Sequence, residues 1–227
     1  MSTPITGPMS GPVTNPVTAA AVVPMTPLLF REESGLADPL AELREIAVHT
    51  VRDLAATVDR IVALCPTGLV GAPDTYHRPS GLKGGETPDA PLSVQIAHHL
   101  LHLAALPAEV AEMAPRSGEN GPSKWQERPS GTTVGLLVLG DGTACRSEAA
   151  PGHIDERAFP FDDLIADALE AGDGDALATL DQDLAEQLMV TGRHTFADLG
   201  TTLPAARAEL RYRDDPYGVS YFVALWQ

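Results

Sequence analysis

The chain has 227 residues and a formal net charge of −16 at pH 7, and hydrophobic residues make up 44% of it. This length and apolar content suit one α/β domain, with a core built mainly from Ala, Leu and Val because aromatic residues contribute only 5%. The acidic charge argues against nucleic acid and anionic membrane surfaces as partners, since it repels phosphate groups.

The first 18 residues predict a disordered tail. Proline recurs there at every fourth position, at Pro4, Pro8, Pro12 and Pro16. The tail lacks the positive charge and apolar run of a signal peptide, and no stretch approaches the roughly 20 apolar residues of a membrane span. Two cysteines, Cys65 and Cys145, are too few for a disulfide framework and indicate a cytoplasmic protein. We therefore expect a tail over 1–18 and one domain over 19–227.

The domain is expected to open with a strand, a helix and a second strand. The apolar run "AAAVVP" begins at Ala19 and predicts a buried strand. The segment 38–57 has apolar residues at helical spacing, with Asp38 as a candidate cap and Pro39 in the first turn. "DRIVALCP", residues 59–66, predicts the next buried strand. This order implies a right-handed parallel crossover.

The middle of the chain alternates long polar segments with apolar ones. Residues 67–91 predict a long loop, and 91–106 predict a helix with Ser93 as a candidate cap. The segment 111–131 is polar and interrupted by Pro and Gly, so no regular element is expected there. "TTVGLLVLG", residues 132–140, predicts the third buried strand.

The last third predicts helices followed by two strands. Helices are expected over 160–173, 175–180 and 181–200, and strands over 208–215 and 217–226, with a turn at Pro216 between them. Together the elements predict a single α/β domain whose central, mostly parallel sheet has helices on both faces.

The last third also carries motifs in a recognisable order. They are Gly140-Asp141, Pro151-Gly152, Phe161-Asp162, the turn 171–173, Gly192 and the strand 216–224. Over about residues 133–226 the chain resembles the class III extradiol ring-cleavage dioxygenases of the subunit-B-like superfamily, and most of all their compact actinobacterial branch of uncharacterised proteins. "VVPMTPLLFREESG", residues 22–35, resembles the opening strand and loop of that family more weakly. The resemblance implies a subunit-B-like fold.

The resemblance also implies an iron site that this sequence lacks. Members of the family hold Fe(II) with two His and one carboxylate, and a further His acts as acid and base. The matching positions here are Met25 or Thr26, the segment 65–68, Thr191 or His194 on the late helix, and Ala144 for the acid/base group. We therefore expect no metal cofactor. The chain would be a degenerate homologue that binds a small molecule or a protein partner in the old cleft.

The cleft candidates follow the predicted strands or lie near the family's motif positions. They are Met25, Thr26, Cys65, Thr67, Asp141, Ala144, His153 and His194. An alternative stays open, in which the chain is an active Fe(II) ring-cleaving dioxygenase with a rearranged ligand set drawn from His77, His153, His194 and Asp141. The sequence also leaves homo-oligomerisation open.

The remaining histidines allow two interpretations. His98 and His102 are four residues apart on a predicted helix, which is the geometry of a two-His metal pair but equally that of a polar helix face. No Glu lies between them in the metalloprotease arrangement. Asp141 likewise suits either a turn cap or a group facing the ligand crevice.

Overall fold

A six-stranded sheet with the order β3-β2-β4-β1-β6-β5 forms the centre of the computed structural model. The structure describes residues 15–34, 38–66, 90–106, 111–115 and 131–227, with the backbone alone for 111–115. The strands are β1 Val17–Val23, β2 Arg60–Cys65, β3 Ala111–Pro115, β4 Val134–Leu139, β5 Ala208–Asp214 and β6 Tyr221–Trp226.

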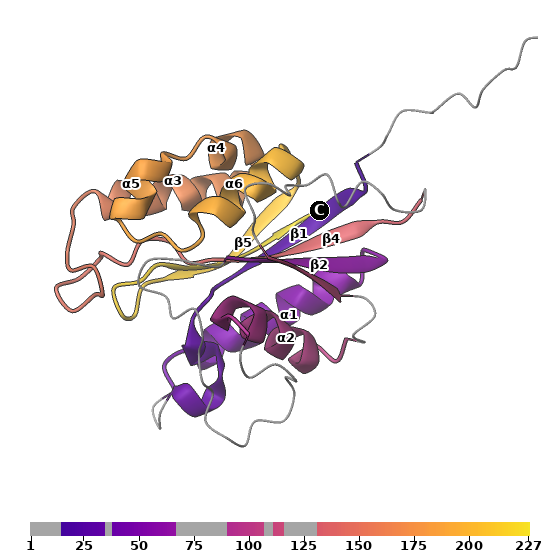
Figure 1. Cartoon of the computed structure of the whole chain (residues 1–227), viewed down its shortest axis with the longest axis horizontal. Coiled ribbons are helices and arrows are strands. Elements are labelled where there is room, and N and C mark those ends of the chain that lie inside the picture. Colours follow the sequence, from indigo (N-terminus) through magenta and orange to yellow (C-terminus); the bar gives the residue numbers. More distant parts are fainter. Residues whose placement is uncertain (1–14, 35–37, 67–89, 107–110, 116–130) are drawn as a thin grey trace, which may run out of the picture.

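Helices cover both faces of this sheet (Figure 1). The helices are α1 Ala41–Ala55, α2 Leu92–Leu103, α3 Ala158–Ala171, α4 Gly174–Ala178, α5 Gln182–Gln187 and α6 Arg193–Thr202, with 3₁₀ turns η1 Pro27–Leu29 and η2 Arg31–Glu33. Helices α1 and α2 lie on one face and α3 to α6 on the other (Figure 1). The expected single α/β domain with helices on both faces is confirmed.

Apart from Thr18 and Arg60 near their starts, the central strands β1, β2 and β4 are apolar because both of their faces are buried. Successive side chains of a strand point to opposite faces. In β1, Ala19, Ala21 and Val23 belong to the core on the side of α1 and α2, whereas Ala20 and Val22 belong to the core on the other side. An alternation of apolar and polar residues is therefore absent from β1, as expected for a strand covered on both faces.

The sheet is parallel over four strands and antiparallel at one end. Strand β4 pairs in parallel with β1 and with β2, and β2 pairs in parallel with β3. Strand β6 is antiparallel to β1, and β5 is antiparallel to β6. The carboxyl ends of β1, β2 and β4 consequently meet at one edge, which is where α/β proteins place ligands.

Two segments differ from their predictions. Strand β1 begins at Val17 rather than Ala19, and Asn15 donates from Nδ2 to the carbonyl oxygen of Thr202 at 2.6 Å, so residues 15–18 belong to the fold and not to the tail. The segment 111–115 forms the edge strand β3, where no element was expected. Its pairing with β2 supplies hydrogen bonds that local composition does not signal.

The long helix expected over 181–200 is two helices. Helix α5 ends at Gln187, Met189 has a positive φ of 57°, and α6 begins at Arg193. A residue in the left-handed region cannot continue an α-helix, so the chain turns at this point. The turn brings Thr191 and Gly192 to the end of β4, where they contact the segment after that strand.

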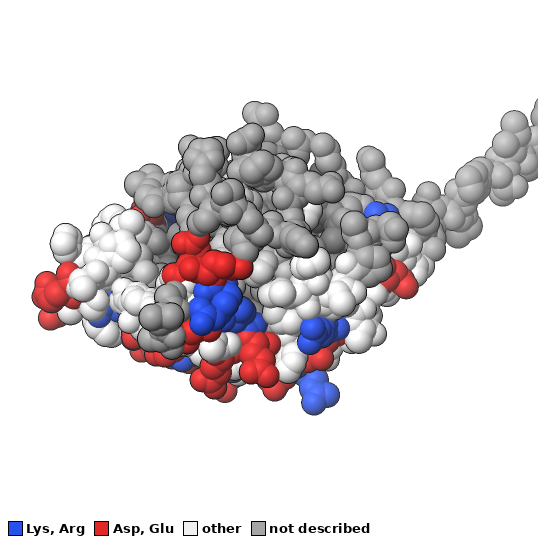
Figure 2. Space-filling view, turned by 90° about the horizontal axis from the view of Figure 1, so that it is seen from below, with Lys and Arg blue, Asp and Glu red and all other residues white. Residues whose placement is uncertain are grey.

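Neither predicted cap acts as a cap. Asp38 has a φ of 40°, and its carboxylate accepts hydrogen bonds from both terminal nitrogens of Arg44 at 3.1 and 3.0 Å. The hydroxyl of Ser93 donates to the carbonyl oxygen of Pro66 at 2.7 Å. Asp38 therefore binds a side chain of α1, and Ser93 ties α2 to the residue after β2, instead of either one satisfying the first turn of its helix. On the side of α1 and α2, the visible Arg and acidic side chains lie close together rather than in separate patches (Figure 2).

Candidate functional site

The carboxyl edge of the parallel strands carries a small group of residues joined by polar contacts, which we call the edge cluster. Its members are Met25, Thr26, Asp141, Thr191 and Tyr221. The backbone N–H of Met25 donates to Oδ1 of Asp141 at 2.8 Å, and the backbone N–H of Asp141 donates to Oγ1 of Thr191 at 2.8 Å. Asp141 therefore joins the segments that follow β1, β4 and α5.

Two hydroxyl groups lie beside this carboxylate. The hydroxyl of Tyr221 is 3.4 Å from Oγ1 of Thr26, which in turn accepts the backbone N–H of Leu28 at 3.4 Å and caps η1. Thr26, Asp141 and Tyr221 are only 4%, 5% and 3% exposed. The edge cluster is thus a set of buried polar groups held by the backbone of three segments.

Burial raises the pKa of two members of the edge cluster. Burial raises the pKa of Asp141 to about 7, although the hydrogen bonds from Met25 and Thr191 oppose the change. Burial also raises the pKa of Tyr221, and the charge of Asp141 adds to this effect. At neutral pH the carboxyl of Asp141 is therefore divided between its protonated and ionised forms, and the phenol of Tyr221 stays protonated.

The segment after β4 lies against α6 with no room for a side chain at its first position. A Cβ added to Gly140 would lie 2.3 Å from Cα of Gly192 and 3.1 Å from Oγ1 of Thr195. The hydroxyl of Thr195 donates to the carbonyl oxygen of Leu139 at 2.8 Å, and the N–H of Gly192 donates to the carbonyl oxygen of Asp141 at 3.0 Å. Glycine at position 140 is required because two backbones meet there.

A second buried carboxylate fixes the same segment from the other side. We call this group the Asp162 cluster, and its members are Thr143, Arg146, Asp162, Asp215 and Ser220. Asp162 is fully buried and accepts from the backbone N–H of Thr143 at 2.9 Å, from the hydroxyls of Thr143 and Ser220 at 2.6 Å each, and from Nη1 of Arg146 at 3.2 Å.

Arg146 completes the Asp162 cluster. Its Nε donates to Asp215, and its guanidinium lies 4.5 Å from the centre of the Phe159 ring. Both oxygens of Asp162 therefore accept hydrogen bonds inside the protein, one at Oδ1 and three at Oδ2. The motif Phe161-Asp162 of the sequence marks a carboxylate that holds the segment after β4 to β6 and α3.

Several predicted site residues meet at the carboxyl edge, as the strand order requires. Met25 and Asp141 are in contact, and Thr26 lies beside them. Cys65 ends β2 at the same edge, where burial raises the pKa of its thiol to about 12, so the thiol stays protonated at neutral pH. Ala144 is buried, its N–H donates to the carbonyl oxygen of Leu188 at 3.0 Å, and its own carbonyl accepts from Gly152 at 2.9 Å.

The other candidates are more dispersed. His153 is exposed, and its Nδ1 lies 3.4 Å from the carbonyl oxygen of Glu148. His194 is half-buried in the first turn of α6. Thr67 and His77 lie outside the described residues.

In the described part of the chain, no three His, Cys, Asp or Glu side chains are placed to hold a metal ion. Asp141, His153 and His194 therefore do not form such a group by themselves. Among the same residues, no helix combines the length and apolar character needed to cross a bilayer.

Sequence reasoning overlooked the groups that support the site. Tyr221, Ser220, Thr143 and Arg146 were not singled out, although each contributes to the edge cluster or to the Asp162 cluster. One usable signal was a single Ser directly before the apolar run "YFVALW". A polar residue beside a fully buried strand needs a hydrogen-bond partner, and the partner here is Asp162.

The raised pKa of Asp141 gives a prediction about pH. The folded protein binds the carboxyl proton of Asp141 more tightly than the unfolded chain does. The stability that the protonated carboxyl contributes is therefore complete below pH 3.8 and is lost as pH rises towards about 7. We expect Asp141→Asn, which carries no charge, to gain stability relative to wild type over that range. The gain should reach at least about 1.4 kcal/mol, the value of one pKa unit.

Urea unfolding of both proteins between pH 4.5 and pH 8 measures this difference. Asp167→Asn, which changes an exposed acid on α3, is the matched control and should show no such trend. A difference between Asp141→Asn and wild type that stays constant over this pH range would contradict the prediction.

The chain was compared with protein-family models and with curated proteins, and neither comparison gave a match. The resemblance to class III extradiol dioxygenases therefore rests on the motifs of the sequence.

Proposed function

We propose that this chain is a degenerate relative of the class III extradiol dioxygenases that binds a small molecule at the carboxyl edge of β1, β2 and β4. In this proposal the chain does not cleave aromatic rings. The edge cluster supplies the polar groups that the ligand meets. A site at this edge agrees with the place where parallel α/β sheets bind ligands.

The observation that carries the proposal is the environment of Ala144. The resemblance assigns the acid/base His of the family to this position, and here the side chain is a methyl group. The residue is buried, and both of its backbone groups are hydrogen-bonded. No proton can be transferred from this position, and loss of such a group alone typically slows a reaction by about 10² to 10⁴.

The positions assigned to the iron ligands support the same conclusion. The backbone N–H of Met25 donates to Asp141, and the side-chain oxygen of Thr26 accepts from Leu28. The thiol of Cys65 is buried and protonated. An iron site of this class needs two His and one carboxylate on one face of the metal. The residues at these positions do not supply such a set.

The groups that remain at the edge favour a ligand with hydroxyl groups. A carboxyl with a pKa of about 7 can donate or accept a hydrogen bond at neutral pH, and the phenol of Tyr221 can do the same. A catechol presents two adjacent hydroxyls that match such partners. Catechol and 3,4-dihydroxybenzoate are therefore suitable probes.

Reconstitution with Fe(II) tests the loss of activity. After anaerobic incubation with Fe(II) and removal of free metal, we expect no stoichiometric iron and no yellow ring-fission product from either probe in air. Both the metal and the acid/base group are needed for the reaction, so the two defects together should leave no measurable rate. Iron is counted by atomic absorption spectrometry, and the ring-fission product is followed by its visible absorbance.

Two variants separate the proposal from the alternative. One tightly bound iron per chain, lost in His153→Ala or His194→Ala and accompanied by ring cleavage, would establish the rearranged Fe(II) ligand set instead.

Binding of the probes is followed separately by NMR of the metal-free protein. Tyr221→Phe should weaken it, whereas Tyr212→Phe on β5 should not. Absence of any binding by wild type would overturn the small-molecule proposal.

A further inference from the structure

Helix α2 presents two histidines on the face opposite its buried face. Leu92, Ile96 and Leu100 are buried against the core, whereas His98 and His102 are exposed. Residues four apart on a helix lie one above the other, with Cβ atoms about 5–6 Å apart. The two imidazoles therefore share one exposed face, one turn apart.

The imidazoles of this pair are not used for packing within the described part of the chain. His99, between them in sequence, packs its ring against Phe30 with ring centres 4.7 Å apart. For His98 and His102 no hydrogen bond, ion pair or ring contact with another described residue occurs. Their ring nitrogens are available to a ligand from solvent.

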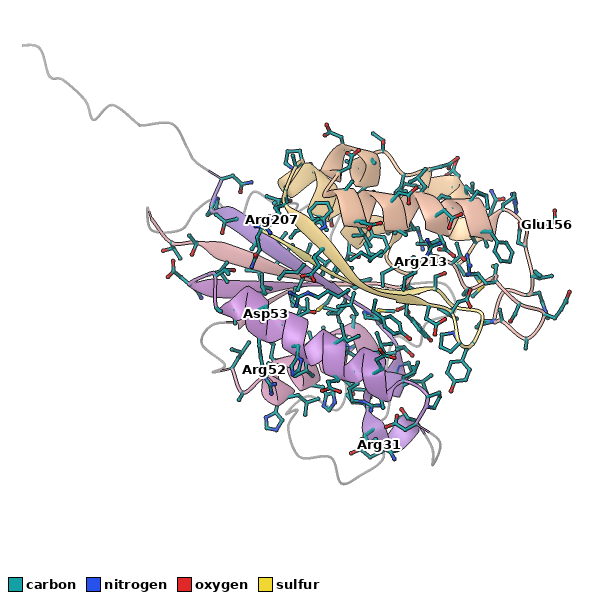
Figure 3. The ribbon with its side chains drawn as sticks, turned by 180° about the vertical axis from the view of Figure 1, so that it is seen from behind. Arg31, Arg52, Asp53, Glu156, Arg207 and Arg213 are labelled. Carbon is teal, nitrogen blue, oxygen red and sulfur yellow. The ribbon has the colours of Figure 1, made fainter. Side chains whose placement is uncertain are left out.

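The helix that carries the pair is fixed at both ends. Near its N-terminus the hydroxyl of Ser93 donates to the carbonyl oxygen of Pro66 at 2.7 Å. At its C-terminus Nη2 of Arg52 on α1 donates to the carbonyl oxygen of Leu103 at 2.8 Å. Figure 3 labels Arg52 on α1, close to α2. Binding at the pair therefore requires no ordering of the helix, which keeps the entropy cost low.

We propose that His98 and His102 form a surface site for a divalent transition-metal ion of the class Cu²⁺, Ni²⁺ or Zn²⁺. Imidazole is a preferred ligand of these ions, and i, i+4 spacing on a helix allows two imidazoles to bind one ion. Among the described residues no third His, Cys, Asp or Glu completes the site, so these residues supply two protein ligands. The net charge of −16 raises the local concentration of cations.

The site is independent of the proposed function, since α2 contributes no side chain to the edge cluster or to the Asp162 cluster. Its affinity should follow the order of divalent ions for nitrogen ligands, with Cu²⁺ binding more tightly than Ni²⁺ or Zn²⁺. With the two ligands that the described residues supply, it suits reversible capture of a metal rather than a structural role, because structural zinc sites use four protein ligands.

Titration of the untagged full chain with CuCl₂, NiCl₂ and ZnCl₂ in a calorimeter tests the proposal. We expect one site per chain for which His98→Ala and His102→Ala each weaken binding at least about tenfold, a loss of about 1.4 kcal/mol. His49→Ala, which removes an exposed histidine from α1, is the matched control and should bind as wild type does.

Electron paramagnetic resonance of the Cu²⁺ complex gives a second readout. We expect ligand hyperfine splitting from two imidazole nitrogens in wild type. In His98→Ala and in His102→Ala we expect splitting from one imidazole nitrogen. Thermal unfolding without metal should be the same for all four proteins, since His98 and His102 are exposed. Unchanged affinity in both His98→Ala and His102→Ala, or an equal loss in His49→Ala, would overturn the proposal.

Discussion

Replacing Asp162 by alanine is expected to lower the free energy of unfolding by about 3–5 kcal/mol, the usual cost of breaking a buried ion pair. The carboxylate accepts four hydrogen bonds, from the backbone N–H and hydroxyl of Thr143, the hydroxyl of Ser220 and Nη1 of Arg146. Removing it leaves a buried N–H and two hydroxyls without their acceptor, and each such group costs about 1–3 kcal/mol.

The next residue in the chain provides the matched control. Asp163 is also on α3, but it is exposed and pairs with Arg213 on β5. Figure 3 labels Arg213. Asp163→Ala should cost no more than about 1 kcal/mol, as is usual for an exposed ion pair.

Asp162→Asn keeps an acceptor for Thr143 but loses the charge opposite Arg146, so its cost should lie between those of the two alanine variants. Urea unfolding measures all three. Equal costs for Asp162→Ala and Asp163→Ala would show that the Asp162 cluster does not hold the segment after β4.

Replacing Gly140 by alanine is expected to cost about 3 kcal/mol or more, at the upper end of the range for overpacking. The added methyl group would lie 2.3 Å from Cα of Gly192, so one of two backbones has to move. Neither moves freely, because Gly140 donates to the carbonyl oxygen of Val23 at 3.1 Å and Gly192 donates to that of Asp141 at 3.0 Å.

Gly135→Ala, within β4, separates backbone crowding from side-chain crowding. There the added methyl would lie 2.8 Å from Cδ1 of Leu54 and 2.9 Å from Cγ2 of Val58, which are side-chain atoms that can rotate away. We expect Gly140→Ala to be less stable than Gly135→Ala by at least about 1 kcal/mol in chemical unfolding. A smaller cost at Gly140 would mean that α6 shifts easily against β4.

These two expected results concern the same short segment and bear on the proposed function. Asp141 ties the start of the segment to Met25, and Asp162 ties its continuation to β6 and α3. A segment fixed on both sides keeps the shape of the edge around Ala144, the residue that the resemblance assigns to the acid/base position. Asp141 and Asp162 thus have structural roles through their hydrogen bonds, and these roles hold whether or not the proposed function is correct.

The sequence by itself determined the elements whose signal is local. The apolar runs that became β1, β2 and β4 are typical of strands in a sheet covered on both faces, and they predicted the α/β class. The parallel order then required the segments after these strands to meet, and the contact between Met25 and Asp141 is the result.

Only the tertiary structure decided the features that depend on partners distant in the chain. Strand β3 exists because β2 offers it hydrogen bonds, and the helix expected over 181–200 is interrupted because Met189 adopts a positive φ that brings Thr191 and Gly192 onto the end of β4. The partners of Asp162 lie 16, 19 and 58 residues away in the chain. A buried carboxylate takes its role from the donors that surround it, and these are brought together only when the sheet and α3 have packed.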